Sequence, residues 1–418
     1  MTKTSKKTVL TPVDEAFDYL MSRALNNGES EKIALSDSLG RILAEDKVAG
    51  VTVPPADNSA MDGYAINTAD LTAGSETRLR IDQRVPAGDV GVPLVPGGVA
   101  RIFTGAPTPE NTNAVVMQEQ CRLEGDSVWL PDGVKVGQNI RKKGEDFNSG
   151  DLLLRKGIKI RPQELGLLAS TGVAEVAVTK KLKVMLFSTG DELVEPGNPL
   201  KPGQIYNSNR YMLAGLIKGM GLECIDGGVI EDNYQATEQA LRDAAKQADM
   251  VLTSGGVSVG EEDHVKNVVE NIGELKLWKL AIKPGKPLAF GELDNEGTTV
   301  PFFGLPGNPA ASFVTFCIMA RPFLLKMSGA SEFQPLQSQG VAQFERSKPG
   351  TRREYLRARL TLGENNQPEV SIYDNQGSGL LSSASWANGF AVIEVGRTIM
   401  KGDVLPFISY GELLGQGA

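Results

Sequence analysis

The chain has 418 residues, enough for two to four domains, since one domain usually has about 100–200 residues. Hydrophobic residues make up 41%, enough for buried cores, and no window holds the ~18 consecutive apolar residues that a membrane-spanning helix needs. The net charge of −8 argues against non-specific binding to nucleic acid. An anionic substrate would therefore need clustered Lys and Arg side chains or a bridging cation.

Cysteine and histidine are scarce in this sequence. The three cysteines, Cys121, Cys224 and Cys317, are far apart, which predicts neither a disulfide framework nor a metal-ligand spacing and suits a reducing cytosol. His264 is the only histidine, so a zinc site built on several histidines is excluded. The basic N-terminus lacks the apolar core of a secretory signal, and we expect a cytoplasmic protein.

The first part of the chain predicts a helical domain that is interrupted by a β-rich one. Thr11-Pro12 suits the start of a helix, and the apolar residues that follow share one helical face. From about 48 to 160, short β-like runs alternate with Pro and Gly. A second helix around Glu164–Ser170 returns the chain to the first domain.

The second part predicts an α/β domain followed by another β domain. Apolar strands at 184–187, 250–253 and 302–305 alternate with helices, which indicates a doubly wound, mainly parallel sheet. After Gly329 the pattern returns to β, as in a small closed or sandwiched β domain. The fold class is thus multidomain α/β. Its expected parts are a mixed helical N-terminal domain (1–55 and 147–179), an inserted β-rich domain (56–146), the α/β domain (180–329) and a C-terminal β-barrel-like domain (333–414).

Three loops follow strands of the predicted parallel sheet, at the edge where doubly wound domains bind ligands. They are Ser188–Glu192, Ser254–Gly260 and Leu305–Pro309. Gly255 and Gly256 let backbone N–H groups approach an anion closely, and the helix start that follows adds its dipole. A tight strand-to-helix turn explains the glycines of one loop equally well, but three such loops at one sheet edge favour a phosphate site.

Carboxylates near these loops can hold Mg²⁺ beside a phosphate, because Mg²⁺ prefers carboxylate and phosphate oxygens. Asp263 follows Ser258, a hydroxyl donor, by five residues. Glu192 and Asp232 are further candidates. The alternative is a helix N-terminal carboxylate, which the helix dipole stabilises by about 0.3–1 kcal/mol.

Lysines gather in the segment from Lys279 to Pro287. Pro284-Gly285 predicts a turn, Lys283 and Lys286 flank it, and Lys279 is expected on the same strand face as Lys283. Ammonium groups clustered in an acidic protein indicate an anion. A solvated hairpin is the common alternative, but the apolar residues beside these lysines favour the anion.

Two other charged groups have structural explanations that are about as common as functional ones. The segment Arg141–Asp146 joins three cations to two carboxylates, as either a metal–phosphate site or a surface salt-bridge loop would. Arg353, Tyr355, Arg357 and Arg359 share one strand face by period two. That face suits an oxyanion or an acidic partner, and it also suits the protection of an edge strand by charge.

The segment Asp57–Ala65 combines two carboxylates with small residues and a tyrosine. Asp57 and Asp62 are too polar for a core, and Gly63 allows an unusual backbone. Asp62 can bind a cation or accept a proton. The residues alone thus favour a functional loop only slightly.

Eight segments resemble, in order, those of the molybdopterin molybdenumtransferase family, called MoeA in bacteria and the E domain of gephyrin in animals. They are Asp57–Ala65, Ile102–Ala106, Gly144–Asp146, Ser188–Leu193, Ser254–Gly260, Lys283–Pro287, Leu305–Pro309 and Gln376–Ser378. The glycine loop is shared with related molybdopterin-binding domains, whereas Asp57–Ala65 is much more specific. Asn207 departs from the family, whose members often have Asp there, and this weakens a metal role at that position.

The resemblance implies a four-part elongated subunit and a homodimer whose active sites use residues from both chains. It implies a reaction in which molybdate is inserted into adenylylated molybdopterin and AMP is released, assisted by Mg²⁺ or a similar divalent cation. The molybdopterin adenylyltransferase is a further expected partner, whereas neither nucleic acid nor a membrane is expected.

The resemblance also assigns roles to individual residues. The predicted catalytic residues are Ser258, Asp263, Asp62, Lys279 and Lys283. The predicted metal ligands are Asp263, Glu192 and Asp232. The predicted substrate-binding residues are Thr104, Arg141, Asp146, Glu192, Gly255, Gly256, Lys286, Pro306, Pro309, Arg357 and Ser378. We expect those of the inserted domain (Asp62, Thr104, Arg141 and Asp146) to enter the active site of the other subunit.

Two alternative functions are open at this point. A molybdopterin adenylyltransferase that uses ATP would share 180–327 but would not need Asp57–Ala65 or the C-terminal β domain. A non-enzymatic scaffold is the second alternative, since animal relatives also bind receptor peptides. Nothing in the sequence resembles a peptide groove.

Overall fold

A six-stranded sheet with helices on both faces lies at the centre of the α/β domain. The computed structural model describes residues 10–256 and 264–414, so the predicted catalytic residues Ser258 and Asp263 lie outside the described residues. In spatial order the strands are β16 (Glu223–Ile230), β13 (Lys183–Thr189), β17 (Met250–Ser254), β21 (Thr298–Leu305), β20 (Pro287–Asn295) and β18 (Gly273–Lys279). The first four are parallel, and β20 and β18 pair antiparallel at one edge. The expected doubly wound, mainly parallel sheet is confirmed.

The strands are apolar on both faces because helices cover both. Leu186 and Leu252 contribute to the core on one face, and Met185 and Val251 to the core on the other, as the period of two requires. The helices of the first face are α1 (Val13–Arg23), α3 (Ser208–Gly219), α6 (Pro309–Thr315), η4 (Phe316–Ala320) and α7 (Arg321–Met327). Those of the second face are α4 (Tyr234–Ala245) and α5 (His264–Ile272).

Helices α6, η4 and α7 form one continuous stretch, Pro309–Met327, close to the long helix predicted from Ala310 to Met327. Its 19 residues are long and apolar enough to cross a membrane. However, 83% of its most apolar window is buried inside the protein. A helix that is apolar all round belongs in a core, and this one is the core helix of the α/β domain.

The first helix, α1, packs on the α/β domain. Leu20 and Met21 are buried in the same core as the sheet residue Phe290, and the ring of Tyr19 lies 6.3 Å from that of Phe290. The predicted N-terminal domain, 1–55 with 147–179, included this helix. The helix packs there because α7 and the sheet cover its apolar stripe. The limits of the predicted domain stay predictions.

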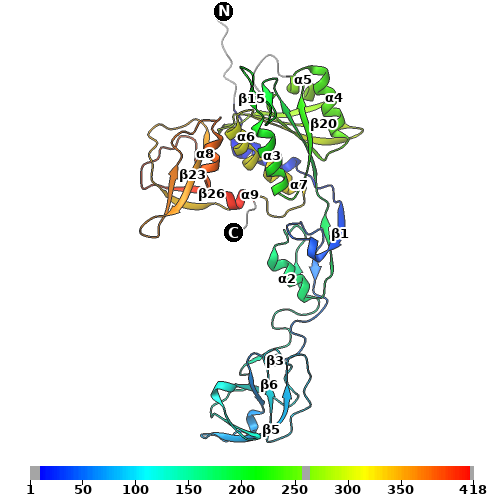
Figure 1. Cartoon of the computed structure of the whole chain (residues 1–418), viewed down its shortest axis with the longest axis vertical. Coiled ribbons are helices and arrows are strands. Elements are labelled where there is room, and N and C mark those ends of the chain that lie inside the picture. Colours follow the sequence, from blue (N-terminus) through cyan, green and yellow to red (C-terminus); the bar gives the residue numbers. More distant parts are fainter. Residues whose placement is uncertain (1–9, 257–263, 415–418) are drawn as a thin grey trace, which may run out of the picture.

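A small domain connects the α/β domain to the inserted one (Figure 1). Its strand pairs are β1 (Ser30–Ala34) with β12 (Glu175–Thr179) and β2 (Lys47–Val48) with β11 (Leu152–Leu154). Helix α2 (Pro162–Ser170), the second predicted helix, shares a core with these strands through Leu168. Its remaining element is the 3₁₀ turn η1 (Leu35–Asp37).

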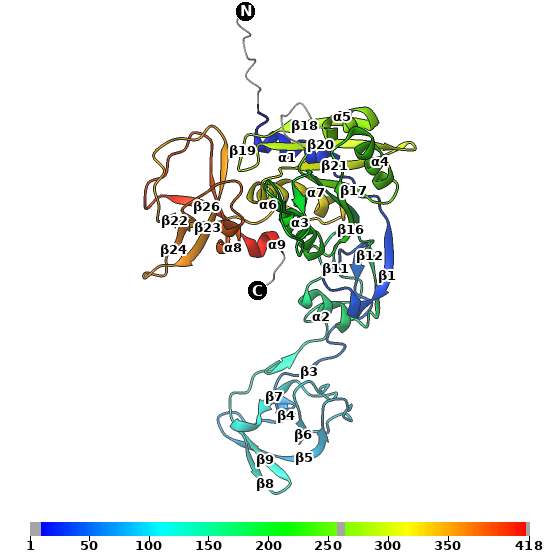
Figure 2. The same ribbon diagram turned by 45° about the horizontal axis from the view of Figure 1, so that its top comes forward.

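The inserted domain lies at the far end of an elongated molecule (Figures 1 and 2). Its sheet has the spatial order β7 (Ala114–Met117), β4 (Gly63–Ile66), β6 (Gly98–Ile102), β5 (Thr77–Val85), β9 (Ser127–Leu130) and β8 (Arg122–Glu124). The short pair β3 (Asn58–Ser59) and β10 (Ile140–Arg141) and the turns η2 (Thr68–Asp70) and η3 (Gln118–Gln120) complete it. Gly63 does not have the unusual backbone that we expected. It is needed because a Cβ there would collide with the carbonyl oxygen of Val116 in the neighbouring strand.

The C-terminal domain is a closed five-stranded barrel, which confirms the expected β-barrel-like domain. Around the barrel the strands are β23 (Arg353–Leu362), β24 (Pro368–Ile372), β22 (Ser338–Ala342), β26 (Val404–Ser409) and β25 (Gly389–Ile393), and β25 pairs again with β23. Strand β19 (Ile282–Lys283) extends this sheet from the α/β domain. Helices α8 (Leu381–Trp386) and α9 (Tyr410–Leu414) lie between the barrel and α6 (Figure 1).

Strand β23 is therefore not an edge strand, because it has partners on both sides. Protection of an edge by charge, one explanation of its arginines, is wrong. Arg357 is fully buried, whereas Arg359 is exposed and stacks on Trp386 at 4.6 Å. Arg353 forms ion pairs with Asp14 and Glu394.

Candidate active site

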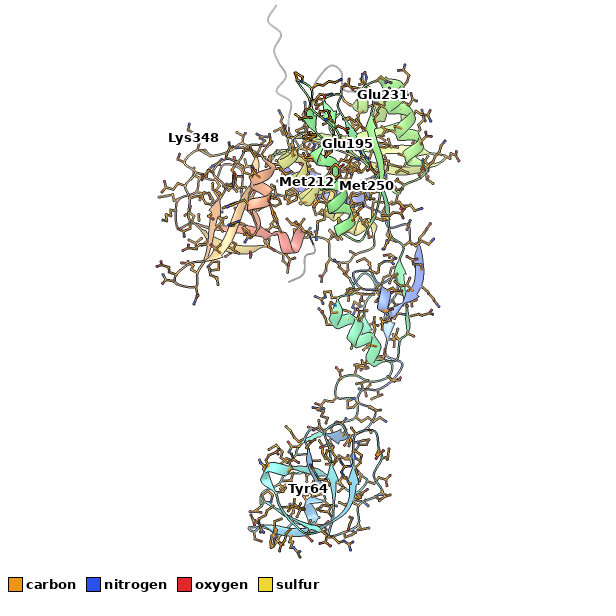
Figure 3. All side chains as sticks on the ribbon, in the orientation of Figure 1. Tyr64, Glu195, Met212, Glu231, Met250 and Lys348 are labelled. Carbon is orange, nitrogen blue, oxygen red and sulfur yellow. The ribbon has the colours of Figure 1, made fainter. Side chains whose placement is uncertain are left out.

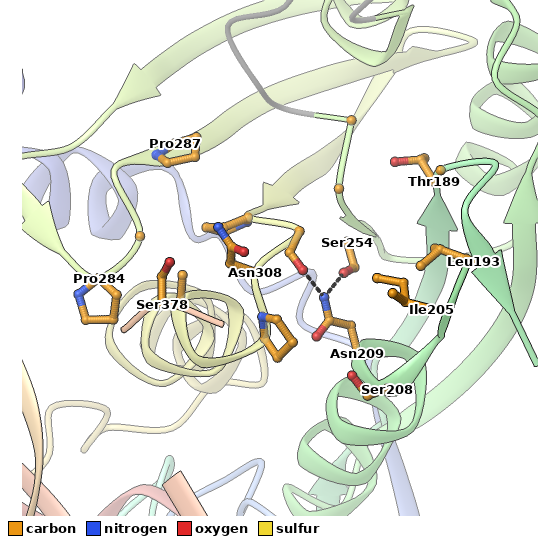
Figure 4. Close-up of a pocket in the computed structure, with 18 of the residues that line it drawn as sticks. Thr189, Leu193, Ile205, Ser208, Asn209, Ser254, Pro284, Pro287, Asn308 and Ser378 are labelled. Carbon is orange, nitrogen blue, oxygen red and sulfur yellow. Dashed lines mark hydrogen bonds between the residues drawn. The ribbon is translucent and has the colours of Figure 1, made fainter. Parts of the chain in front are cut away.

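A pocket of ≈ 850 Å³ lies at the carboxyl ends of the parallel strands (Figure 4). Ser254 pairs with Ser188 on one side and with Leu305 on the other, so the three strand-end loops lie side by side. The start of α3, the turn around Pro284 and a loop of the barrel form the other walls. The pocket thus lies between the α/β domain and the barrel.

The glycine loop comes close to its neighbours. Gly255 and Gly256 have φ angles of 92° and 65°, which side chains rarely adopt. A Cβ at Gly255 would lie 2.8 Å from the backbone oxygen of Thr189, and one at Gly256 would lie 2.6 Å from Val265 Cγ2. Glycine is therefore needed at both positions for the loop to pack against its neighbours, and the approach of its backbone N–H groups to an anion stays a prediction.

Asn209 connects two of the loops. Its side-chain Nδ2 donates to Ser254 Oγ at 2.8 Å and to the Gly307 carbonyl at 2.7 Å (Figure 4). Asn209 is only 7% exposed, and its Oδ1 has no hydrogen-bond partner within the described part of the chain. The nearby Asn207 caps α3 by accepting from Arg210 N, and it also accepts from Ser188 Oγ.

The predicted lysines separate in the structure. Lys283 and Lys286 line the pocket, and Lys279 is not among its lining residues. The expectation that Lys279 and Lys283 share a strand face is wrong. Lys279 pairs with Pro287 in the α/β sheet, whereas Lys283 belongs to β19 and pairs with the barrel.

The positive charge of the pocket is only partly neutralised. Lys283 Nζ lies 3.1 Å from Oε1 of the buried Glu354, and the other oxygen of Glu354 binds Arg346 at 2.8 Å. Arg352 also lines the pocket, and it donates to the Ile282 carbonyl at 3.1 Å. Glu354 is thus shared by two cations, so it does not fully balance Lys283.

Arg357 lies behind the barrel loop that lines the pocket. Its Nε donates to Ser383 Oγ at 2.9 Å and its Nη2 to the Gly377 carbonyl at 3.0 Å. Its Nη1 is buried and has no partner among residues 10–256 and 264–414. Burial lowers the pKa of this guanidinium, but an arginine stays charged. In the described part of the chain its hydrogen bonds are thus to neutral oxygens, one of them on Gly377, which precedes the pocket residue Ser378.

Glu192 and Asp232, two of the predicted metal ligands, line the pocket, and both are exposed. No group of three His, Cys, Asp or Glu side chains suited to a metal occurs in the described ranges. The third predicted ligand, Asp263, lies outside them. Pro306 and Pro309 also line the pocket.

The predicted residues of the inserted domain do not reach the pocket of their own chain. Asp62 Oδ1 accepts hydrogen bonds from the backbone N and from Oγ1 of Thr104, both at 2.8 Å. These bonds lower the pKa of the Asp62 carboxyl, the backbone bond most. Arg141 and Asp146 are exposed on the same domain. The predicted site thus divides into two groups, one at each end of the molecule (Figure 1).

Three family models match this chain in order. They are the MoeA N-terminal region (domains I and II) at 11–172, a probable molybdopterin-binding domain at 185–326 and the MoeA C-terminal region (domain IV) at 339–410. A molybdopterin molybdenumtransferase of Haemophilus influenzae is 40% identical over 96% of this chain and 99% of its own. One from Staphylococcus aureus is 33% identical over 93% of each chain.

The chain belongs to the MoeA family of molybdopterin molybdenumtransferases. A crystal structure of the molybdopterin biosynthesis moeA protein from Pyrococcus horikoshii has a TM-score of 0.84, with 31% identity over 96% of this chain and 100% of that one. The resemblance seen in the eight segments is confirmed. As a family member, the chain is an enzyme of molybdenum cofactor biosynthesis, and the adenylyltransferase and scaffold alternatives are not favoured.

Sequence reasoning missed several polar residues of the pocket, among them Asn209, Arg352 and Gln376. Gln376 is part of one of the eight segments but received no role, and Asn209 and Arg352 received none either. Gln376 accepts from Arg357 N at 3.0 Å and donates to the Arg357 carbonyl, so it holds the barrel loop on β23. In the sequence, each of Asn209, Arg352 and Gln376 is a polar residue close to an end of a predicted helix or strand. Such residues are too common for this position alone to indicate a binding role.

Proposed function

We propose that this enzyme inserts molybdate into adenylylated molybdopterin and releases AMP, giving molybdenum cofactor. The observation that carries the proposal is that the glycine loop faces a cationic wall in one pocket. That wall includes Lys283, Lys286 and Arg352, with Arg357 behind it. An acidic protein that gathers cations beside such a loop is built to bind an anion.

The glycine loop is proposed to hold the pyrophosphate. Gly255 and Gly256 bring backbone N–H groups close to it, and the start of α5 adds a favourable dipole. Cleavage of the phosphoanhydride needs no nucleophilic side chain, because water or a molybdate oxygen attacks. We propose that Ser258 and Asp263 act on the bond that breaks, and that Lys283 stabilises the developing negative charge.

The cationic wall is proposed to hold molybdate. Lys286 and the hydroxyl of Ser378 both face the pocket, and the buried charge of Arg357 lies behind them. A bound oxyanion would compensate the charge of Arg357, which no carboxylate balances among the described residues. Lys279 is proposed to add charge from outside the pocket, at the end of β18.

Magnesium, or a similar divalent cation, is proposed to assist. The carboxylates of Glu192 and Asp232 at the pocket wall supply the oxygen ligands that Mg²⁺ prefers, and Asp263 would be the third. The ion would neutralise charge on the pyrophosphate oxygens. The chain's own part is to hold these carboxylates beside the glycine loop.

We propose a homodimer in which the inserted domain of one subunit completes the pocket of the other. Asp62 and Thr104 are hydrogen-bonded to each other at the surface, which suits a ligand contact and serves no core. Arg141 and Asp146 would enter with them. The enzyme is expected to act in the cytoplasm and to receive its substrate from the molybdopterin adenylyltransferase.

Purified protein tests the reaction. Added to preformed adenylylated molybdopterin, it should release AMP only when molybdate is present. Added to ATP and molybdopterin, it should form no adenylylated product. Formation of that product, or AMP release that does not depend on molybdate, would overturn the proposal.

A further inference from the structure

The inserted domain carries a cation–aromatic cluster that no proposed role has used. The guanidinium carbons of Arg84 and Arg101 each lie 4.5 Å from the centre of the Phe103 ring. Arg101 also lies 5.3 Å from the centre of the Tyr64 ring, which Figure 3 labels within this domain. Two like charges therefore share one aromatic ring at the surface.

Strand pairing holds the two arginines together. Arg84 in β5 pairs with Arg101 in β6 in parallel register, so both side chains leave the same face of the sheet. Like charges directly opposite each other destabilise a strand pair. The contact of each guanidinium with Phe103 offsets part of this repulsion.

The two arginines differ in what else they bind. Arg101 donates from Nη1 to the Gly63 carbonyl at 2.9 Å and from Nη2 to the Gln118 side chain, so its position is fixed. Arg84 is exposed, and its guanidinium forms no hydrogen bond or ion pair with any residue that the structure describes. The cluster thus presents one free guanidinium on a rigid base.

The cluster adjoins the pair proposed to enter the other subunit's pocket. Thr104 follows Phe103 directly and binds Asp62 through its backbone N and its hydroxyl. The charge of Arg101 is close enough to help lower the pKa of the Asp62 carboxyl. Arg84 stacks on Phe103, the residue before Thr104, so its free guanidinium lies one residue along the chain from the pair that is proposed to contact the ligand.

We propose that Arg84 binds a phosphate oxygen of the adenylylated substrate, while Phe103 and Arg101 hold it in position. A guanidinium matches the spacing of phosphate oxygens and can stack on a ring at the same time. Because the stack limits the motion of Arg84, less conformational entropy is lost on binding. This inference rests on the proposed function, and it adds a substrate contact on the inserted domain.

The test compares Arg84→Ala with Arg78→Ala in the full-length protein. Arg78 is a matched control, because it lies on the same strand and pairs at the surface with Glu124 at 3.6 Å. In Arg84→Ala, the KM for adenylylated molybdopterin should rise about tenfold or more, the effect of one lost hydrogen bond to a charged group. The KM for molybdate should not change, and Arg78→Ala should resemble the wild type.

Two further measurements separate binding from a structural role. Raising the ionic strength should increase the wild-type KM for the adenylylated substrate more steeply than that of Arg84→Ala. Phe103→Leu keeps the charges and most of the apolar volume, so its KM should rise only about two- to fivefold, the effect of an exposed cation–π contact. Arg84→Ala should unfold at no lower a temperature than the wild type, because it also removes the repulsion between the two guanidiniums.

The outcomes are distinguishable. Equal KM values for Arg84→Ala and Arg78→Ala, in an enzyme that releases AMP normally, would refute the role of Arg84 alone. A wild-type protein that releases no AMP would refute the proposed function, and this substrate contact with it.

Discussion

Arg357→Met is the substitution that best separates the stability of this protein from its proposed function. Arg357 is fully buried, and methionine has a similar length but carries no charge. The change removes the hydrogen bonds to Ser383 Oγ and to the Gly377 carbonyl. Ser383 keeps its own hydrogen bond to the Leu380 carbonyl, so its hydroxyl hydrogen is not left without an acceptor.

Two opposing effects determine the change in stability. Each lost hydrogen bond stabilised the fold by about 1.5–3 kcal/mol, because the donor is charged. Desolvation of a guanidinium that no carboxylate balances costs several kcal/mol, and Arg357→Met removes that cost. The two effects nearly cancel, so we expect the unfolding free energy to change by less than about 2 kcal/mol.

Activity should respond quite differently. Loss of one preorganised charge near the reacting oxyanion should lower the rate of AMP release by about 100-fold or more. Molybdate at a hundred times its Kd should stabilise the wild type by about 2.7 kcal/mol and should not stabilise Arg357→Met. Arg359→Met is the control, because Arg359 is exposed on the same strand, and it should keep activity.

The assays are AMP release and thermal unfolding with and without molybdate. If Arg357→Met unfolded at a far lower temperature than the wild type, the balance of energies would be wrong and the residue would be mainly structural. If the variant kept full activity, its charge would have no part in the reaction.

Three other perturbations have defined outcomes. Asn209→Ala removes two buried hydrogen bonds, so the unfolding free energy should fall by about 1–3 kcal/mol, measured by denaturant titration, and the KM for the adenylylated substrate should rise. Asp62→Ala and Lys286→Ala are each expected to be inactive. When the two variants are mixed in equal amounts, about half of the dimers are heterodimers, and each heterodimer has one intact site of two, so about a quarter of wild-type activity should return. The Arg353 ion pair lowers the pKa of the Asp14 carboxyl below its ordinary value of 3.8. The wild type should therefore be more stable than Asp14→Asn, and this difference in unfolding free energy should have its full size at any pH above 3.8. It should disappear as the pH falls through the lowered pKa in thermal unfolding scans.

Each of these outcomes has a clear opposite. If the unfolding free energy of Asn209→Ala equalled that of the wild type, the hydrogen bonds of Asn209 to Ser254 and Gly307 would not contribute to stability. Mixed subunits with no recovered activity would place both residues in one subunit's site, or in none. A stability difference at Asp14 that persists at the lowest pH would rule out the ion pair as its source.

Local patterns predicted much of the α/β domain, because burial on both faces of a strand leaves a continuous apolar run. Val184–Phe187 and Met250–Thr253 were predicted as strands for that reason, and both lie in the central sheet. Closure of the C-terminal barrel was harder to predict, because it depends on the pairing of β23 with β25, which are far apart in sequence. Arg357 points out of the barrel and is buried because α8 and the loop at Gln376–Ser378 cover it, although its spacing matched that of the exposed Arg359.

The sequence by itself determined the family, through Asp57–Ala65 and seven other segments, and the order of strands and glycine loops. Only the tertiary structure decided which residues share a pocket. It brought Asn209 and Gln376 into one pocket with the glycine loop and excluded Lys279 from it. It also placed the inserted domain, to which Asp62 belongs, at the opposite end of the molecule. The physical reason is that periodicity records which face of an element is buried, whereas sheet order and domain placement arise from contacts between distant segments.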